Sequence, residues 1–350
     1  MSYQALLARV VGRNIPFSVL LELTYRCNLD CFYCYNDLTR TGTPLSVDQY
    51  LALFRDLRAL GTLNLTLSGG EPLAHPDVFT LGAAARAQGF LVRVKTNGHA
   101  LHGRLARRLR DAVDPYILEI SLHGASPATH DRQTRVPGSF ARLLRNLDGL
   151  IHLGQRVQLN ATLTAWNQAE LESMEALAQG LDLPLRWNTH VTPRDDGDAS
   201  PLSIAPSAEA VARLREVLAR RPGAANDDGG EPPTPWDKYC GSGASGFTVD
   251  PWGNLYPCVQ WRIPAGNLHR QSVREIWEGS ETLKRVRGRT EALAQAVKLE
   301  GPGILGGSGC PALAERSGQM RVALPVPFRG ADQRAQRAAA AAVSTGERTR

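Results

Sequence analysis

The chain has 350 residues, of which 43% are hydrophobic and 21% charged, so it can bury one large core or one core with a smaller module. Its six cysteines, half of them clustered, do not resemble the disulfide framework of a small secreted protein. No apolar run approaches the length that spans a bilayer, and the first residues lack a secretory cleavage pattern. We therefore expect a cytoplasmic protein whose thiols stay reduced, with no membrane partner.

The net charge of +6 is unevenly distributed along the chain. Residues 329–350 contain five arginines and two acids, so half of the net charge lies in a segment rich in Ala and Gln. A basic, low-complexity terminus is more often solvated than folded, and we expect residues 321–350 to form a disordered tail. The chain shows neither interleaved aromatic residues nor a recognisable nucleic-acid module, so we expect no nucleic-acid partner.

Strand and helix patterns alternate through the first two thirds of the chain. Apolar or alternating runs predict strands at residues 19–24, 63–67, 90–95, 116–121, 157–163 and 185–189. Helical periodicity predicts helices at residues 47–60, 77–88, 100–112, 139–153 and 168–179. Repeated strand, helix, strand units with right-handed crossovers predict an α/β fold, here a partial (β/α)6 TIM-like barrel. Such barrels carry their chemistry at the C-terminal ends of the strands.

The composition changes after Thr192, which predicts a second, smaller domain. A helix is expected at 207–220, and residues 222–235 form a linker rich in Gly, Pro and Asp. Two short strands about the turn Pro251-Trp252-Gly253-Asn254 predict a hairpin, and a helix is expected at 272–277. We divide the chain into an N-terminal extension (1–17), the barrel (18–200), a helix and linker (201–235), a small α+β domain (236–320) and the tail (321–350).

Three cysteines lie within eight residues, directly after the first predicted strand: Cys27, Cys31 and Cys34. Three thiolates on one loop can hold three irons of a cubane cluster and leave the fourth iron open to a ligand. From these residues alone, two other interpretations remain open. The same spacing places small apolar side chains on one helix face, and cysteines also bind zinc. Structural zinc sites usually add a second cysteine pair or nearby histidines, whereas no His follows Cys34 before His75.

A second motif, Ser68-Gly69-Gly70-Glu71-Pro72, follows the second predicted strand. Together with the cysteine loop it resembles the radical S-adenosylmethionine (radical SAM) enzymes. In that family the open iron chelates SAM, and the reduced cluster cleaves SAM to a 5'-deoxyadenosyl radical. The resemblance therefore implies a 4Fe-4S cluster on Cys27, Cys31 and Cys34, which would form the catalytic centre, and SAM bound beside it.

The resemblance also assigns SAM contacts to the strand ends. Expected contacts with SAM come from residues that follow the first four strands: Tyr33 near the adenine, Gly69, Gly70, Glu71 and Pro72 near the ammonium group, Thr96 and Asn97 after the third strand, and Ser121 near the ribose. A guanidinium of Arg132 or Arg135 could hold the SAM carboxylate, and solvated helix charges are the alternative.

Residues near the last strands are candidates for substrate contacts. His123 stands where close relatives in the family have Asp, and its neutral imidazole would contact substrate or satisfy a backbone carbonyl. Asn160, Thr162, Asn188 and His190 belong to the ends of the fifth and sixth strands, where side chains can bond a substrate without touching SAM. The alternative is that some of them face the outer helices and only pack.

The predicted hairpin lies between two further cysteines, Cys240 and Cys258. This segment resembles the opening of the SPASM and twitch modules, which hold auxiliary iron-sulfur clusters, and Cys310 is a third candidate ligand. A full SPASM module has seven cysteines, so we expect one auxiliary cluster at most, with three buried thiols as the alternative. The fourth iron would need another ligand, such as Asp250, His269, solvent or a substrate group.

The resemblance implies an enzyme that abstracts hydrogen from a substrate. Enzymes of this subgroup mostly modify ribosomally made peptides, so a peptide crosslink or a related radical change is the first expectation. A small molecule of tetrapyrrole or aminoglycoside type is the alternative substrate, and a non-catalytic iron-sulfur or zinc scaffold is an alternative of another class. We expect an electron donor such as flavodoxin or ferredoxin. Because only seventeen residues precede Ser18, a leader peptide would need a separate recognition protein or a groove in this chain.

Overall fold

The computed structural model describes residues 3–221, 238–300 and 309–316. The linker predicted at 222–235 and the tail predicted at 321–350 lie outside these residues. The strands are β1 (Ser18–Thr24), β2 (Asn64–Gly69), β3 (Leu91–Thr96), β4 (Ile117–Ser121), β5 (Val157–Thr162), β6 (Leu185–Asn188), β7 (Gly246–Val249), β8 (Asn254–Tyr256) and β9 (Gly266–Asn267). The helices are α1 (Tyr3–Gly12), α2 (Val47–Leu60), α3 (Val78–Ala87), α4 (Gly103–Arg108), α5 (Pro127–Thr134), α6 (Ser139–His152), α7 (Leu171–Gly180), α8 (Ala208–Ala219), α9 (Val273–Gly279), α10 (Glu281–Glu300) and α11 (Pro311–Arg316).

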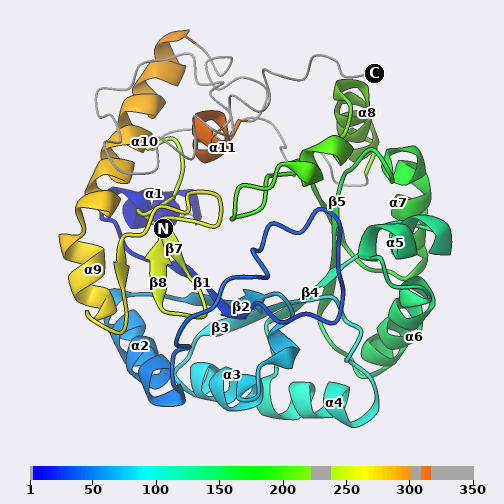
Figure 1. The fold of residues 1–350 in the computed structure, drawn as a ribbon, viewed down its shortest axis with the longest axis horizontal. Coiled ribbons are helices and arrows are strands. Elements are labelled where there is room, and N and C mark those ends of the chain that lie inside the picture. Colours follow the sequence, from blue (N-terminus) through cyan, green and yellow to red (C-terminus); the bar gives the residue numbers. More distant parts are fainter. Residues whose placement is uncertain (1–2, 222–237, 301–308, 317–350) are drawn as a thin grey trace.

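One curved sheet forms the centre of the molecule, with strands in the order β6-β5-β4-β3-β2-β1-β7-β8-β9. Strands β1 to β6 pair in parallel, each with its neighbour in sequence. Helices α2, α3, α4, α6 and α7 lie along its outer side (Figure 1). Because β6 and β9 are the edges of the described sheet, the barrel does not close. The predicted partial (β/α)6 barrel is therefore confirmed.

The parallel strands have one apolar face and one polar face. Leu21, Leu67 and Val94 belong to the core, together with helix residues such as Phe54 and Leu147. The alternate residues of the same strands face the inside of the barrel, since successive side chains of a strand point to opposite faces. This inner face is polar, with Glu22, Thr66 and Glu119 among its residues. A strand pattern that alternates, rather than one that is apolar throughout, therefore marks the side of the sheet where a ligand can bind.

Local signals in the sequence explain where the predicted helices begin and end. Helix α2 begins after a capping box in which Ser46 accepts from the backbone N–H of Gln49, and it ends at Gly61, whose φ is +93°. Four of the described helices were not predicted: α1, α5, α10 and α11. Helix α10 has 20 residues and eight charged side chains, so its apolar stripe is narrow. Of the described helices, none is long and apolar enough to cross a membrane.

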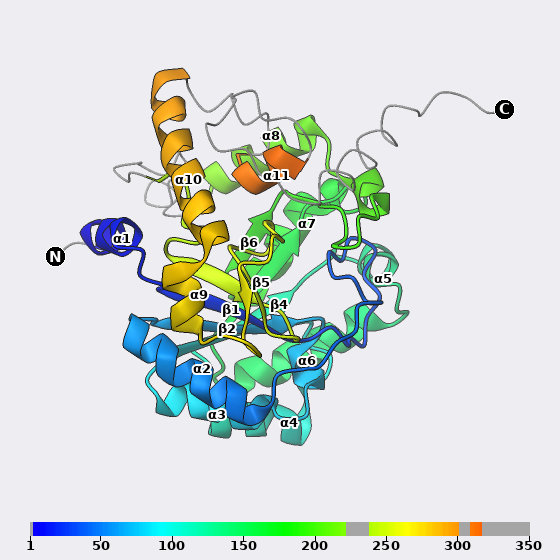
Figure 2. The ribbon, with the colours of Figure 1, turned by 60° about the vertical axis from the view of Figure 1, so that its left-hand side comes forward.

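The predicted C-terminal hairpin extends the barrel sheet. Strand β7 pairs in parallel with β1, with Leu20 opposite Thr248, and β8 pairs with β7 in antiparallel. Helices α9 and α10 follow one another along the side of the molecule that carries the hairpin (Figure 2). The indole N–H of Trp277 in α9 donates to the carbonyl of Asn14 at 2.7 Å, which fixes this helix against the N-terminal segment. The hairpin is thus joined to β1, the strand that leads into the cysteine loop.

Candidate functional site

The cysteine loop follows β1 at the C-terminal edge of the sheet. All six cysteines of the chain are free thiols, and Cys31 and Cys34 are half-buried while Cys27 is exposed. A turn bond from the Cys34 N–H to the Cys31 carbonyl, 3.0 Å, brings the last two thiols to one side of the loop. The Cys27 sulfur accepts from the N–H of Leu29 at 3.4 Å. The loop is therefore an irregular turn, and the alternative of a helix with packed cysteines is wrong.

The thiols of this loop influence one another electrostatically. Burial, followed by the charges of Cys34 and Cys27, raises the pKa of the Cys31 thiol above its usual range. Burial also raises the pKa of Cys34 to about 11. Protonated thiols release their protons when a metal cation binds, because metal binding and thiol deprotonation are coupled. The donor set of three close thiols thus fits an iron-sulfur cluster.

Segments far away in the sequence fix the backbone of the loop. Arg194, in the segment after β6, donates to the carbonyls of Cys34 at 3.0 Å and Phe32 at 3.1 Å. From the end of α5, the carbonyls of Thr134 and Gln133 accept from the N–H groups of Asp30 and Phe32. The cysteines are therefore held at both sides of the loop. Arg194 escaped prediction because its partners are backbone groups 160 residues away, which leave no local pattern.

The paired glycines allow the second motif to pack directly on the cysteine loop. Gly69 has a φ of +131°, and a side chain there would overlap the carbonyl oxygen of Thr24. A Cβ on Gly70 would lie 2.6 Å from the Tyr25 carbonyl oxygen. The Gly70 N–H donates to the Thr24 carbonyl at 2.7 Å, and the amide of Asn36 donates to the Gly69 carbonyl at 3.1 Å. Both glycines are required by this close approach of two backbones.

Glu71 connects the second motif to the third strand. Its buried carboxylate accepts from the Thr96 hydroxyl at 2.8 Å and from the backbone N–H groups of Leu73 and Asn97 at 3.0 and 2.9 Å. The side-chain amide of Asn97 in turn lies 3.7 Å from the Cys27 sulfur. This chain of contacts holds the second motif against the end of β3 and the cysteine loop. Pro72 follows as the first residue of a short 3-10 turn (Pro72–Ala74).

The predicted arginines pack against aromatic rings of the same region. The Arg135 guanidinium lies 3.1 Å from the Asp30 carboxylate and 4.8 Å from the centre of the Phe32 ring. The Arg132 guanidinium lies 4.2 Å from the centre of the Trp166 ring, which itself stacks on Phe32. Both side chains are exposed and each rests against an aromatic ring, and a contact of either with SAM stays a prediction.

Tyr33 and His123 form a contact between the cysteine loop and the end of β4. The Tyr33 hydroxyl and the His123 Nδ1 atom are 2.8 Å apart. The backbone carbonyl of His123 accepts from the side-chain amides of Gln133 and Asn167. Ser121, the last residue of β4, is half-buried on the inner face two residues earlier. The structure thus brings Tyr33, Ser121 and His123 to one part of the rim.

His123 also belongs to a group of buried histidines that was not predicted. The rings of His123 and His130 are 5.0 Å apart, and His99 is buried close to both. Burial, followed by the neighbouring imidazoles, lowers the pKa of His123. Burial, followed by the charge of His99, lowers the pKa of His130 to about 4, against the opposing charges of Asp131 and Glu170. These imidazoles are therefore neutral in the folded protein at pH 7.

We expect this group to make the protein lose stability in weak acid. An imidazole whose pKa falls on folding contributes fully above its unfolded pKa of about 6.5, and its contribution declines as the pH drops toward the folded value. At pH 5 His130 alone should cost about 2 kcal/mol relative to pH 7.5. Urea unfolding at the two pH values should show this loss in the wild type and a clearly smaller loss in His130→Gln. Identical pH dependence in both proteins, or an equal change in the exposed control His152→Gln, would contradict the assignment.

The candidate substrate residues divide into two groups. Asn160 and Thr162 face the inside of the barrel, and the Asn160 amide donates to the Glu119 carboxylate at 2.7 Å. Glu119 also accepts from Arg93 on β3, so a polar network crosses the inner face. Asn188 is the last residue of β6, at the edge of the sheet, and His190 follows it. The side-chain oxygen of Asn188 accepts from the His190 N–H at 3.1 Å, and its side-chain nitrogen donates to the His190 carbonyl at 3.2 Å. The structure therefore places Asn160, but not Asn188, within the network.

The C-terminal cysteines come from three segments that pack together. Cys258 and Cys310 pack against the same buried cluster of Trp261, Val286 and Ala312. Burial, together with charges on Cys258 and Cys310, raises the pKa of Cys240 to about 11. The Cys258 sulfur accepts from the Trp261 N–H at 3.3 Å. This is a second set of three close thiols, with the donor chemistry of an auxiliary cluster.

The two further ligand candidates do not join these cysteines. Asp250 lies in the turn of the hairpin, at the opposite end from Cys240 and Cys258, and it accepts from the N–H groups of Trp252 and Asn254. His269 is exposed and contacts Gln49 and the Thr43 carbonyl. Among the described residues, no group of three His, Cys, Asp or Glu side chains converges as the ligands of a single ion would. Thiolates of a cubane bind different iron atoms, so they need not converge on one point.

A buried ion pair connects the two parts of the molecule. Arg262, from the segment after Cys258, forms hydrogen bonds to both oxygens of Glu22 on β1, at 2.6 and 2.9 Å. Glu22 also accepts from the hydroxyls of Tyr25 and Tyr35, each at 2.9 Å. Tyr35 follows the last cysteine of the loop. The ion pair therefore links the C-terminal segment to β1 and to the cysteine loop.

Comparison with known proteins agrees with this geometry. Residues 21–178 match the family model of the radical SAM superfamily, and residues 240–298 match SPASM, described as an iron-sulfur cluster-binding domain. The first match includes both rim motifs, and the second includes Cys240 and Cys258. The chain thus combines SAM and 4Fe-4S chemistry in the barrel with an auxiliary iron-sulfur cluster in the C-terminal part.

Two curated relatives cover most of the chain. The AdoMet-dependent heme synthase of Methanosarcina barkeri is 28% identical over 307 residues, which are 79% of this chain and 86% of that protein. The PqqA peptide cyclase of Ruegeria pomeroyi is 31% identical over 327 residues, which are 85% of this chain and 84% of that protein. The two names describe different kinds of substrate.

A solved structure shows the same fold. Streptococcus suis SuiB bound to S-adenosylmethionine aligns with a TM-score of 0.64 at 15% identity, over 82% of this chain and 72% of that one. The cysteine loop, the glycine motif, the open parallel barrel and the two family matches lead to one conclusion. The chain is an enzyme of the radical SAM superfamily that carries a SPASM domain.

Proposed function

We propose that this enzyme modifies a ribosomally made peptide, by a crosslink or a related radical change at an unactivated carbon. The observation that carries the proposal is the similarity to the PqqA peptide cyclase of Ruegeria pomeroyi, which is 31% identical to this chain and is covered over 84% of its length. The polar inner face, with Asn160 and Glu119 in one network, offers side chains that can bond peptide groups.

The residues of the rim would have separate roles in this reaction. Cys27, Cys31 and Cys34 would hold the cluster, which together with SAM supplies the radical that abstracts hydrogen from the substrate. Arg194 fixes the loop that carries the thiolates, and Glu71 fixes the glycine motif against it. These contacts hold the site before any substrate arrives, which favours a defined position of the reacting groups.

The proposal includes partners and the auxiliary site. We infer that Cys240, Cys258 and Cys310 are the ligands of one auxiliary cluster. A one-electron donor of flavodoxin or ferredoxin type would reduce the enzyme, and a separate protein would recognise the leader segment of the peptide. The reaction would take place in the cytoplasm, where such donors keep clusters reduced.

A second candidate function is chemistry on a small molecule of tetrapyrrole type. The similarity to the AdoMet-dependent heme synthase favours it, at 28% identity over 86% of that protein. To separate the two candidates, the anaerobically reconstituted enzyme is incubated with SAM, a reductant and one of two sets of substrates. One set is the short peptides encoded beside the gene, and the other is porphyrins with propionate side chains. A peptide that loses two hydrogen atoms by mass spectrometry supports the proposal, whereas a changed porphyrin with unchanged peptides would replace it by the second candidate.

Asn160 provides a prediction about substrate binding within the proposed reaction. Asn160→Ala should lower substrate turnover about tenfold, because it removes an amide from the inner-face network, while SAM cleavage without substrate stays within about twofold of the wild type. The two rates are measured in parallel as modified substrate and 5'-deoxyadenosine. The exposed Gln179→Ala serves as control and should change neither. An equal loss of both rates would place Asn160 in the SAM site or the core instead.

A further inference from the structure

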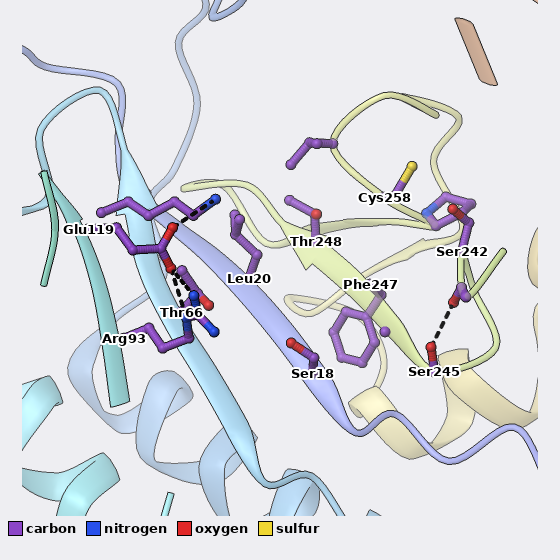
Figure 3. Close-up of a pocket in the computed structure, with 15 residues that line it drawn as sticks. Ser18, Leu20, Thr66, Arg93, Glu119, Ser242, Ser245, Phe247, Thr248 and Cys258 are labelled. Atoms are coloured by element: carbon purple, nitrogen blue, oxygen red, sulfur yellow. Dashed lines mark hydrogen bonds and ion pairs between the residues drawn. The ribbon is translucent and has the colours of Figure 1, made fainter. Parts of the chain in front are cut away.

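A cavity lies between the inner face of the barrel and the C-terminal cysteine segment. Its volume is about 400 Å³, within the usual range for small-ligand sites. Figure 3 shows Arg93 and Glu119 on the sheet side and Cys258 on the opposite side, with Phe247 and Thr248 of β7 between them. The cavity therefore borders the auxiliary cysteines through Cys258.

The walls of this cavity carry a net positive charge. Arg93, Lys95 and Glu119 are the charged residues among those that line it, so its walls carry two positive charges and one negative charge. Glu119 is almost fully buried, and burial opposes its charge, but Lys95, Arg93 and the Asn160 hydrogen bond keep its pKa below the usual range. It therefore stays ionised and neutralises one of the two cations.

Arg93 and Lys95 share this carboxylate unequally. Two nitrogen atoms of the Arg93 guanidinium contact the same oxygen of Glu119, at 2.7 and 2.6 Å. The other oxygen accepts from Asn160 at 2.7 Å, and the Lys95 ammonium stays 3.6 Å from it. Among the described residues, the Lys95 ammonium donates no hydrogen bond, and 45% of the side chain is exposed. An accessible ammonium with unused donors faces an excess of positive charge, which a bound anion would relieve.

The position of Lys95 relates the cavity to the rim. Lys95 precedes Asn97 by two residues, and Glu119 precedes Ser121 by two, so each pair is separated by about 7 Å along its strand. The cavity thus begins directly below the residues predicted to contact SAM. A group bound at Lys95 would hold a substrate between that rim and the auxiliary cysteines.

We propose that this cavity binds a carboxylate of the substrate, with Lys95 as its main partner and Arg93 beside it. The inference rests on the proposed function and narrows the substrate to one that carries an acid. An acidic side chain of a peptide and a propionate of a tetrapyrrole share this chemistry. The hydroxyls of Thr66, Ser242 and Thr248 are available in the same cavity for the second oxygen of the carboxylate.

Binding of acid and amide probes to the reconstituted holoenzyme tests the proposal. The probes are a dye-labelled nonapeptide pool with a fixed central Glu, the same pool with Gln, a porphyrin with propionate side chains and its propionamide. The acid form of at least one pair should bind about tenfold more tightly than its amide, and the pair that shows it identifies the source of the carboxylate. Lys95→Gln should reduce this preference to less than about threefold. Lys95→Arg should restore it, and the exposed control Lys284→Gln should retain it.

Two results would overturn the inference. One is the absence of acid preference in both probe pairs, and the other is an unchanged preference in Lys95→Gln. The KM for SAM in the uncoupled reaction is measured in the same variants, and a rise there instead of a change in probe binding would assign Lys95 to the SAM carboxylate. A peptide that is modified without any acid preference would leave the proposed function intact and remove only this inference.

Discussion

Replacing Arg262 by Met is expected to lower the thermal midpoint of unfolding by about 5–10 °C, which corresponds to a loss of about 3–5 kcal/mol. Glu22 is fully buried, and Arg262 is 10% exposed. Without the guanidinium, the Glu22 carboxylate keeps two tyrosine hydroxyls but loses its counter-charge. Removal of one partner of a buried ion pair is costly because the other charge remains in a site that excludes water.

The same substitution should also loosen the cysteine loop. Asp195, another partner of Arg262 at 3.2 Å, donates its N–H to the Tyr35 carbonyl at 2.8 Å. Tyr35 lies beside Cys34 and donates its hydroxyl to Glu22. We therefore expect iron to leave Arg262→Met faster than the wild type when a chelator is added under anaerobic conditions.

Two further variants distinguish the loss of the counter-charge of Glu22 from an unspecific loss of stability. Glu22→Gln combined with Arg262→Met should recover part of the lost stability, since the Glu22 carboxylate is gone while Asp195 still lacks its contact with the Arg262 guanidinium. Arg274→Met removes an arginine from an exposed pair with Glu278, where both side chains are about half exposed, and should cost about 1 kcal/mol or less. A midpoint for Arg262→Met within 2 °C of the wild type, at about the level of this control, would show that the ion pair does not hold the two parts together.

The features that the sequence predicts well are those with local signals. Both bounds of helix α2 were predicted correctly, because Ser46 and Gly61 mark its ends. The glycine motif can be recognised in the sequence because Gly69 adopts a φ that favours glycine. The alternating strands likewise predicted six parallel strands and the edge where the cysteines gather. These patterns need only neighbouring residues, so one sequence is enough to find them.

The contacts that assemble the site depend on residues that are distant in sequence. Arg262 and Glu22 are 240 residues apart, and nothing near either one indicates the other. Arg194 lies in a loop whose composition indicates only a turn, and its partners are carbonyls. The parallel pairing of β7 with β1 was also hidden, because a hairpin pattern predicts its own turn but not the strand beside it. The three-dimensional fold was needed to reveal them.

Removing the thiolates of the cysteine loop is expected to have the largest effect on activity. Cys27, Cys31 and Cys34 changed together to Ala leave the barrel core intact, since these side chains are half-buried or exposed and belong to no core cluster. The wild type should hold about eight irons per chain after reconstitution, and the triple variant about four, retained by the C-terminal cysteines. Four irons in the wild type and none in the variant would mean that Cys240, Cys258 and Cys310 are packing thiols.

The most direct measurement is the formation of 5'-deoxyadenosine and methionine from SAM after anaerobic reconstitution and reduction with dithionite. The wild type should form both products, and the Cys27/Cys31/Cys34 triple Ala variant should form neither above the background of reagents without protein. Circular dichroism of both proteins checks that the fold is the same. Reductive cleavage of SAM by the triple variant at a rate near that of the wild type would contradict the assignment of this loop as the catalytic centre.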